Sequence, residues 1–171
     1  MKILMLMTLL LLSACTATIE DYQQTQPEFK LNEFFNGSLK AYGVVIDYSG
    51  KVIRRFNVDM LGTWTNNTGV LDETFYYDDG TTEKRIWTLT DKGQGNYQGT
   101  ADDVLGTANG KTNGFALNWH YTLKIPVENT IWHINFNDWM YLLDNKRLIN
   151  RADMNKWGFK IGEVILWIEK Q

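Results

Sequence analysis

The chain has 171 residues, of which 44% are hydrophobic and 13% aromatic, and its formal net charge is −3. This length suits one domain with a substantial core, and the aromatic content argues against disorder. The small negative charge gives no electrostatic basis for binding nucleic acid. A single cysteine excludes a disulfide framework and a multi-cysteine metal site within one chain.

Residues 1–15 predict the cellular compartment. Lys2 precedes an apolar run over 3–12, interrupted only by Thr8, and the run leads into Ser13-Ala14-Cys15. A positive start, a short apolar stretch and small residues before a cleavage position are typical of a secretory signal peptide. Ten helical residues span about 15 Å, half the hydrocarbon thickness of a bilayer, so the run is too short for a transmembrane helix.

The cysteine lies where cleavage is expected. Leu12-Ser13-Ala14-Cys15 resembles the lipobox of bacterial lipoproteins, in which signal peptidase II cleaves before a cysteine that carries diacylglycerol. The resemblance implies a cleaved signal peptide over 1–14 and lipid attachment at Cys15. The alternatives are an ordinary signal peptide with a chance cysteine, or a buried N-terminal helix. In the proteobacterial lipoproteins that this segment resembles, an aspartate after the cysteine favours the inner membrane. Thr16 stands there in this chain, so the resemblance implies the periplasmic face of the outer membrane, if the organism is a Gram-negative bacterium.

The start of the mature chain predicts a lipidated tether followed by a short helix. Residues 15–26 are polar and without periodicity, and the stretch 16–26 reaches about 35 Å at most. The segment 27–37 begins with proline, ends with glycine and contains three phenylalanines, which is typical of a short helix. We expect its aromatic side chains to plug one end of the domain that follows, which spans 27–171.

Beyond residue 41 the hydrophobic pattern has a period of two, which indicates strands. We expect strands over 42–48, 51–60, 70–77, 83–90, 95–102, 114–125, 130–136, 139–143, 147–151 and 159–169. Many short strands separated by turn residues predict an all-β antiparallel barrel or sandwich. We favour a lipocalin-like up-and-down barrel of about 8–10 strands, because closure removes the sheet edges.

Charged residues lie on apolar faces of the predicted strands. Glu73 and Phe75 share one face of their strand, and Arg85 and Trp87 share one face of the next. If these faces coincide, Glu73 and Arg85 project inward and form an ion pair, because buried charges need partners. Arg54 adds a third charge on an apolar face. Such groups can bind the polar end of an apolar ligand, and the alternative is a structural salt bridge or a charge at the rim.

Two further aromatic clusters stand out. Trp119 and Tyr121 belong to an alternating apolar set that either lines a cavity or fills a core, since barrels of this size do both. Asn137-Asp138-Trp139 begins the densest polar and aromatic cluster. Asp138 could act as an acid or base if buried, but a lone carboxylate is no mechanism. We favour the interpretation that Asp138 fixes a turn at a strand junction.

Other signs of chemistry are weak. His120 and His133 have no matching carboxylate or cysteine cluster, so we expect no metal and no cofactor. The sequence has no Gly-x-Ser-x-Gly nucleophile motif, and no catalytic residue is assigned. Gly62-Thr63-Trp64 resembles the Gly-x-Trp signature of lipocalins, but strands already precede it, so it is set aside.

Short motifs over nearly the whole mature chain form a recognisable set. They are Phe35-Asn36-Gly37 with Ala41-Tyr42-Gly43, Arg55-Phe56-Asn57-Val58, Leu71-Asp72-Glu73-x-Phe75, Asp79-Gly80, Arg85-x-Trp87, Tyr97-x-Gly99-x-Ala101-x-Asp103, Asn137-Asp138-Trp139-Met140-Tyr141, and Asn150-Arg151-Ala152-Asp153-Met154 with Lys156 and Gly158. The set resembles an uncharacterised family of bacterial lipoproteins, grouped as a domain of unknown function with a lipocalin-like (calycin) barrel. The resemblance implies a barrel and outer-membrane attachment, but no activity. Asn137 departs from the pattern, where a second acidic residue is expected.

Three hypotheses for function follow. The first is an anchored periplasmic protein that binds a hydrophobic small molecule such as a fatty acid or lipid, with Arg54 or Arg85 meeting an acidic head group. The second is a non-catalytic structural or protein-interaction component of the envelope. The third is an enzyme acting on a lipid or isoprenoid-like substrate, which needs a carboxylate with a strongly perturbed pKa. The candidate ligand-binding residues are Arg54, Glu73, Phe75, Arg85, Trp87, Trp119, Tyr121, Asp138 and Trp139.

Overall fold

A computed structural model describes residues 16–171, so the predicted signal peptide and the predicted lipid attachment at Cys15 lie outside the described residues. Within this range the chain forms ten strands in succession. They are β1 (Gly37–Asp47), β2 (Val52–Thr65), β3 (Thr68–Tyr77), β4 (Thr82–Gly93), β5 (Asn96–Thr100), β6 (Ala108–Asn113), β7 (Ala116–Val127), β8 (Thr130–Leu142), β9 (Arg147–Lys156) and β10 (Phe159–Lys170).

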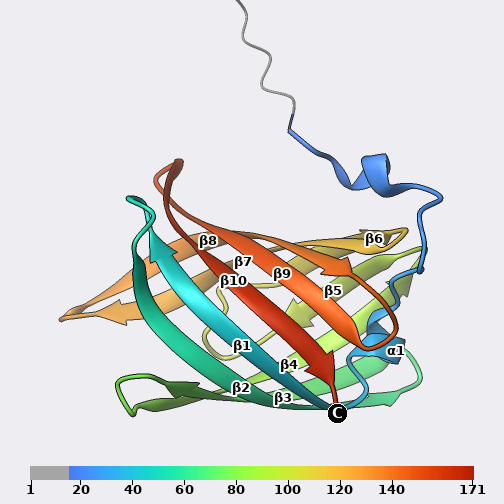
Figure 1. Cartoon of the computed structure of the whole chain (residues 1–171), viewed down its shortest axis with the longest axis horizontal. Helices are drawn as coiled ribbons and strands as arrows, with labels where there is room; N and C mark the ends of the chain where they lie inside the picture. The colour runs from blue at the N-terminus through green and yellow to red at the C-terminus, as the bar shows by residue number, and fades with distance from the viewer. Residues whose placement is uncertain (1–15) are drawn as a thin grey trace, which may run out of the picture.

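The strands form one closed antiparallel barrel in which each strand pairs with its neighbours in the chain. Closure comes from β1 and β10, which pair from Leu39 opposite Lys170 to Asp47 opposite Gly162. Figure 1 shows β1, in cyan, lying beside β10, in red. The predicted all-β, lipocalin-like up-and-down barrel is confirmed. No helix in the described part of the chain is long and apolar enough to cross a membrane.

About ten strands were predicted and ten are present among the described residues, but the structure differs from the prediction at two places. The expected strands over 130–136 and 139–143 are one continuous strand, β8, and β6 was not predicted. Polar β6 lacks the alternation of a strand because a large side chain of β7 occupies its inner face. A Cβ atom on Gly110 would lie only 2.1 Å from the indole ring of Trp119, so this position must be glycine for the ring to fit.

The segment before β1 closes one end of the barrel, as expected from its aromatic residues. Phe29, Phe34 and Phe35 are buried, and their rings contact one another at centroid distances of 5.1–6.4 Å. The helix itself is a single turn, α1 (Leu31–Phe34), shorter than predicted. Before it, the backbone N–H of Phe29 donates to the carbonyl of Gly114 (2.8 Å), which ties this residue to the barrel wall. We call residues 29–35 the plug.

Strand β2 holds the plug through the tripeptide Gly62-Thr63-Trp64. The indole Nε1–H of Trp64 donates to the carbonyl oxygen of Phe35 (2.9 Å). A Cβ atom at Gly62 would lie 2.0 Å from the same oxygen, so only glycine allows this close approach. The motif therefore has a clear role in this barrel, which is to seat the backbone of the plug against the wall.

The expected tether is partly docked on the outside of the barrel. A short 3-10 helix, η1 (Ile19–Tyr22), contacts β6 and β7. The Tyr22 ring packs edge-on against Phe115 at a centroid distance of 5.3 Å, and Lys111 forms an ion pair with Glu20 (2.8 Å). The backbone N–H of Phe115 donates to the hydroxyl of Thr25 (3.2 Å). The polar sequence did not reveal these contacts, because they depend on side chains of the distant barrel wall.

The plug supplies the first testable expectation. Replacing Phe29 with alanine should lower the free energy of unfolding by about 3–5 kcal/mol, because the ring is almost completely buried and leaves a cavity. Urea unfolding followed by tryptophan fluorescence measures the change. Phe159→Ala is the matched control, since this ring is 75% exposed and its loss should change stability by less than about 0.5 kcal/mol. Equal losses for the two variants would contradict the role of the plug.

Candidate ligand-binding cavity

The interior of the barrel holds a cavity of about 650 Å³, which lies within the usual range for small-molecule sites. The inward aromatic residues therefore line a cavity and do not fill the interior completely. Eight of the nine candidate residues line it: Arg54, Glu73, Phe75, Arg85, Trp87, Trp119, Tyr121 and Asp138.

Trp139 is the one candidate residue that does not line the cavity. Its neighbours Asp138 and Met140 line the cavity, so the alternation of β8 places Trp139 on the outer face. There its ring stacks on Tyr141 at a centroid distance of 6.1 Å and contacts Tyr22 at 5.8 Å. Trp139 therefore helps to dock η1 rather than to bind a ligand.

Aromatic rings from three strands form one wall of the cavity. Trp87 meets Trp119 edge to face at 6.0 Å and Tyr121 at 5.5 Å. Tyr121 in turn stacks on Phe136 at 5.0 Å with an interplanar angle of 5°. The sequence did not single out Phe136, although its position in an alternating strand was visible. These rings give the cavity a rigid apolar surface.

The two ends of the cavity differ. Leu31 and Phe35 of the plug close one end. The turns β1–β2, β3–β4, β7–β8 and β9–β10 gather at the opposite end, which we call the mouth (Figure 1). Several large apolar side chains at the mouth are exposed, and we call them the apolar rim. They are Tyr48, Ile53, Ile131, Trp157 and Phe159.

A buried ion pair crosses the inner face of β3 and β4, as predicted. Glu73 lies directly opposite Arg85, with 3.8 Å between Oε2 and Nη1, and both side chains are about 15% exposed or less. Arg85 also binds Asp103, at 2.7 Å from Nη2 and 2.8 Å from Nε. Asp103 comes from the loop between β5 and β6, which Val104 holds against the wall through a bridge to Leu123. Sequence reasoning missed this residue, although it belongs to one of the family-like motifs.

Asp138 is buried and faces the cavity from the middle of β8. Its carboxylate accepts hydrogen bonds from the side-chain amide of Asn150 and from the Tyr121 hydroxyl, the latter at 3.4 Å. The interpretation that Asp138 fixes a turn was wrong, because the strand continues through this position with Trp119 and Ala152 as cross-strand partners. Asn150, also buried, was not predicted as a site residue.

Burial changes the protonation of these groups. Loss of solvation raises the pKa of Glu73 to about 7, opposed by Arg85 and reinforced by Asp103. It also raises the pKa of Asp138 to about 7, opposed by the hydrogen bonds from Asn150 and Tyr121. Burial alone would lower the pKa of Arg85, but Glu73 and Asp103 outweigh it and raise the pKa, so the guanidinium stays charged.

Arg54 lies nearer to solvent. Its guanidinium lies 3.4 Å from the centre of the Tyr77 ring, and Nη2 is 3.2 Å from Asp79 in the β3–β4 turn. The Tyr77 hydroxyl donates to Glu83 (2.8 Å), another residue that lines the cavity. Both arginines that were expected to meet an acidic head group therefore have carboxylate partners in the protein itself.

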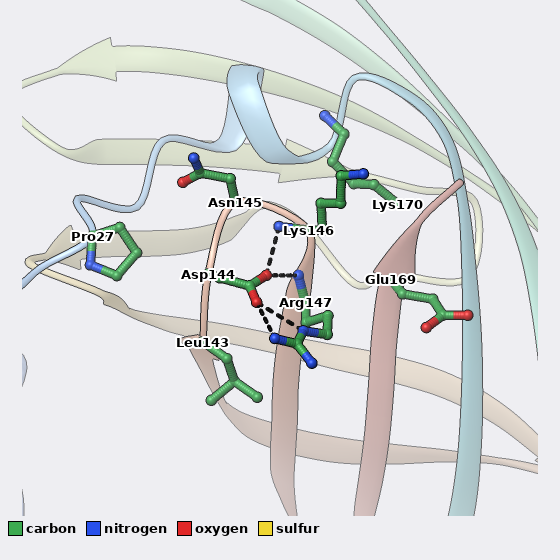
Figure 2. A pocket seen from close by; sticks show the side chains of 8 residues that line it. All are labelled: Pro27, Leu143, Asp144, Asn145, Lys146, Arg147, Glu169 and Lys170. Atoms are coloured by element: carbon green, nitrogen blue, oxygen red, sulfur yellow. Dashed lines mark hydrogen bonds and ion pairs between the residues drawn. The ribbon is translucent and has the colours of Figure 1, made fainter.

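A second hollow of about 570 Å³ lies on the outside, between the β8–β9 turn and the end of β10 (Figure 2). Its main polar feature is the network around Asp144. Asp144 accepts hydrogen bonds from the backbone N–H groups of Lys146 and Arg147, both at 2.9 Å, and from the Arg147 side chain. This hollow is a turn stabilised by Asp144 and open to solvent.

The described residues contain no group of three or more His, Cys, Asp or Glu side chains that could hold a metal ion. Tyr121, Asp138 and Arg85 are instead held by hydrogen bonds and ion pairs within the protein. The polar chemistry of the cavity thus includes two carboxyl groups, on Glu73 and Asp138, whose pKa values burial raises to about 7. The charged residues Arg85, Arg54, Glu83 and Lys124 also line it.

An up-and-down antiparallel barrel with one plugged end and an internal cavity defines a lipocalin-like protein. The chain belongs to the family described as "Protein of unknown function (DUF3833)", which it matches over residues 9–170. A solved structure with a similar fold is that of the S-type phycobiliprotein lyase CPES from Guillardia theta. The TM-score is 0.60 at 7% sequence identity, covering 84% of this chain and 94% of the lyase. At this identity the likeness concerns the fold. No curated protein sequence matches the chain.

The raised pKa of Glu73 makes stability depend on pH. Between the ordinary value of 4.5 and about 7, the folded protein keeps a proton that the unfolded chain has lost, so stability falls as pH rises through this window. Glu73→Gln removes this contribution and should flatten the profile by roughly 3 kcal/mol between pH 4.5 and 7.5. Urea unfolding at several pH values measures it.

Asp72→Asn is the matched control for this experiment. Asp72 precedes Glu73 on β3 but is partly exposed and pairs with Lys84 at 3.0 Å. Its variant should keep the wild-type slope. Parallel profiles for wild type and Glu73→Gln would show that Glu73 does not titrate in this window.

Proposed function

We propose that this protein is an outer-membrane-anchored periplasmic lipoprotein that binds a hydrophobic small molecule, such as a fatty acid or lipid, inside its barrel. The observation that carries the binding proposal is the cavity of about 650 Å³ with an aromatic wall and a few inward polar groups. That composition is characteristic of ligand sites. The phycobiliprotein lyase supports the proposal only through its similar barrel.

The energy of binding would come from the aromatic wall. Each methylene moved from water to an apolar surface contributes about 0.8 kcal/mol, so a chain of a dozen methylenes contributes several kcal/mol after ordering costs. Trp87, Tyr121 and Phe136 are held in fixed mutual geometry, so little side-chain freedom remains to be lost on binding.

The mouth supports exchange of such a ligand with a membrane. Tyr48, Trp157 and Phe159 are at least 75% exposed at the turns that surround it. Aromatic side chains of this kind are favoured at the interface between lipid and water. Lys156 underlies two rings of this region, with its ammonium 3.7 Å from the centre of Trp132 and 4.7 Å from that of Trp157.

Blocking the cavity tests ligand binding. Ala152 is buried and lines the cavity, so Ala152→Phe should fill part of it and reduce bound ligand at least tenfold. Native mass spectrometry of the full lipidated protein, released from detergent micelles, measures bound molecules by mass. Thr88→Phe adds the same ring on the exposed face of β4 and should leave the bound amount unchanged. Equal loss in both variants, or no bound molecule in any of them, would contradict the proposal.

The anchor is proposed from the lipobox-like sequence at residues 12–15. Cys15→Ala should abolish incorporation of labelled palmitate, whereas Ser13→Ala keeps a small residue and should retain it. Thr16→Asp should move the protein from outer-membrane to inner-membrane fractions on a density gradient. Palmitate labelling of Cys15→Ala would rule out lipid attachment at this residue, and an unchanged gradient position for Thr16→Asp would contradict the sorting assignment.

Two observations favour the alternative functions. The apolar rim is also suited to a protein partner, which in-cell crosslinking from Trp157 would capture reproducibly if the protein is an interaction component of the envelope.

The second observation concerns catalysis. The pKa values of Glu73 and Asp138, both about 7, meet the condition of a strongly perturbed carboxylate pKa for an enzyme acting on a lipid. Recovery of a chemically unchanged ligand after prolonged incubation would decide against catalysis.

A further inference from the structure

The turns at the mouth differ in composition from turns at the plug end. The mouth carries the apolar rim, whose large side chains are exposed on β2, β8, β10 and the β1–β2 and β9–β10 turns. At the plug end, the β2–β3 and β4–β5 turns are Asn66-Asn67 and Gln94-Gly95. Exposed apolar side chains that gather at one end of a protein mark an interaction surface. The mouth therefore has the composition of a contact surface.

Trp157 is held in a backbone conformation that disfavours its side chain. Lys156 pairs with Phe159, so Trp157 and Gly158 are the two central residues of the β9–β10 turn, with φ of 52° and 83°. Such turns favour Asn-Gly, because both central residues have positive φ. The Trp157 ring is 83% exposed and lies 4.7 Å from the Lys156 ammonium, so burial within the protein offsets little of the backbone cost. A tryptophan at this tip indicates a contact outside the folded chain.

The turns at the mouth carry nearly balanced charge. Asp78 of the β3–β4 turn lies 3.0 Å from Arg55 of β2. Its neighbour Asp79 lies 3.2 Å from Arg54. The β1–β2 turn carries one lysine and the β7–β8 turn one glutamate. A surface of exposed rings without a strong field of either sign fits a neutral phospholipid bilayer, where aromatic side chains are favoured at the interface.

The apolar surface continues from the rim into the cavity. Ile53 is exposed on the rim and also lines the cavity. On the other side of the mouth, Ile125 and Pro126 line the cavity and lead into the β7–β8 turn, which Ile131 follows. A hydrophobic molecule that leaves the cavity onto a lipid surface here does not cross water. A folded protein partner would need an apolar cavity of its own at this point, so continuity favours lipid as the occupant.

The described N-terminal segment does not cover the rim. The Tyr22 ring of η1 packs against Phe115, and Phe115 follows the β6–β7 turn at the plug end. Figure 1 shows η1, in blue, at the end of the barrel away from the mouth. Contact through the rim is therefore separate from attachment through a lipid on Cys15.

We propose that the apolar rim is a membrane-docking site. The mouth rests on a phospholipid surface, with the rings of Tyr48, Trp157 and Phe159 in the interfacial region and the cavity opening towards the lipid. This inference rests on the proposed function, since it makes the membrane the source of the hydrophobic ligand. It does not require the cavity to be occupied while the rim is docked.

The position of the rim in a bilayer tests the proposal. The full lipidated protein carries an environment-sensitive fluorophore on Asn129→Cys in the β7–β8 turn, and wild type reports labelling at Cys15, the single natural cysteine. The protein is placed in phosphatidylcholine vesicles with an excess of empty vesicles. Nitroxide-labelled phosphatidylcholine should quench this fluorophore about fivefold more than one on Asn67→Cys, in the β2–β3 turn at the plug end.

Substitution of the tip tests the role of the rings. Trp157→Asn with Phe159→Ser should reduce quenching at position 129 about tenfold, because the interfacial rings are lost. Trp157→Asn alone should reduce it by less and keep or raise the stability to urea, because asparagine adopts positive φ more readily. Gln94→Asn is the matched control, since it makes a similar exchange at φ of 54° in the β4–β5 turn and should leave quenching unchanged.

Each outcome decides for or against docking. Equal quenching at positions 129 and 67 would overturn the inference, and so would unchanged quenching in the double variant. A loss of quenching in Gln94→Asn equal to that in the double variant would overturn the assignment to the rim. A hydrophobic molecule found in the cavity by native mass spectrometry without docking would leave the proposed ligand binding intact. Docking by a protein whose cavity binds nothing would overturn ligand binding instead.

Discussion

Hydrogen bonding between β1 and β10 is the constraint on which the rest of the structure depends. It joins the first and last strands of the barrel and leaves no open sheet edge, so every strand has two partners. Once the sheet is closed, each inward residue faces an enclosed, poorly solvated interior. The charged side chains on that face must therefore satisfy one another, and Arg85 meets both Glu73 and Asp103 for this reason.

The interior is layered along the barrel axis. Apolar residues of the plug occupy one end, and Glu73, Arg85 and Asp138 lie further along the strands. The approach from the mouth is lined by apolar residues and by the charged residues Arg54, Glu83 and Lys124. Trp119 fits beside its neighbours because Gly99 and Gly110 leave room for its ring, where added Cβ atoms would lie 2.7 and 2.1 Å away. The same wall that gives the cavity its shape thus depends on glycines in two short polar strands.

The sequence predicts those features that follow from alternation. Glu73 and Arg85 could be paired because each lies on the apolar face of an evident strand, and the period of two settles which way they point. The grouping of Trp139 with Asp138 ignored the same alternation. Both residues belong to one dense cluster in the sequence, but adjacent positions of a strand face opposite sides of the sheet. Asn137-Asp138 has a local preference for turns, which the surrounding sheet overrides. Asp103 and Asn150 could not be assigned, because their roles depend on partners in distant segments.

The docking of η1 also sets how far the barrel can stand from the proposed point of attachment at Cys15. Tyr22 and Glu20 are held against β6 and β7, so only the residues from Thr16 to Thr18 separate the docked helix from Cys15 in the sequence. Four residues extend about 14 Å at most, well short of the reach expected for an undocked segment. If Cys15 carries lipid as proposed, the protein works close to the membrane surface, and a soluble cargo or partner must come to it.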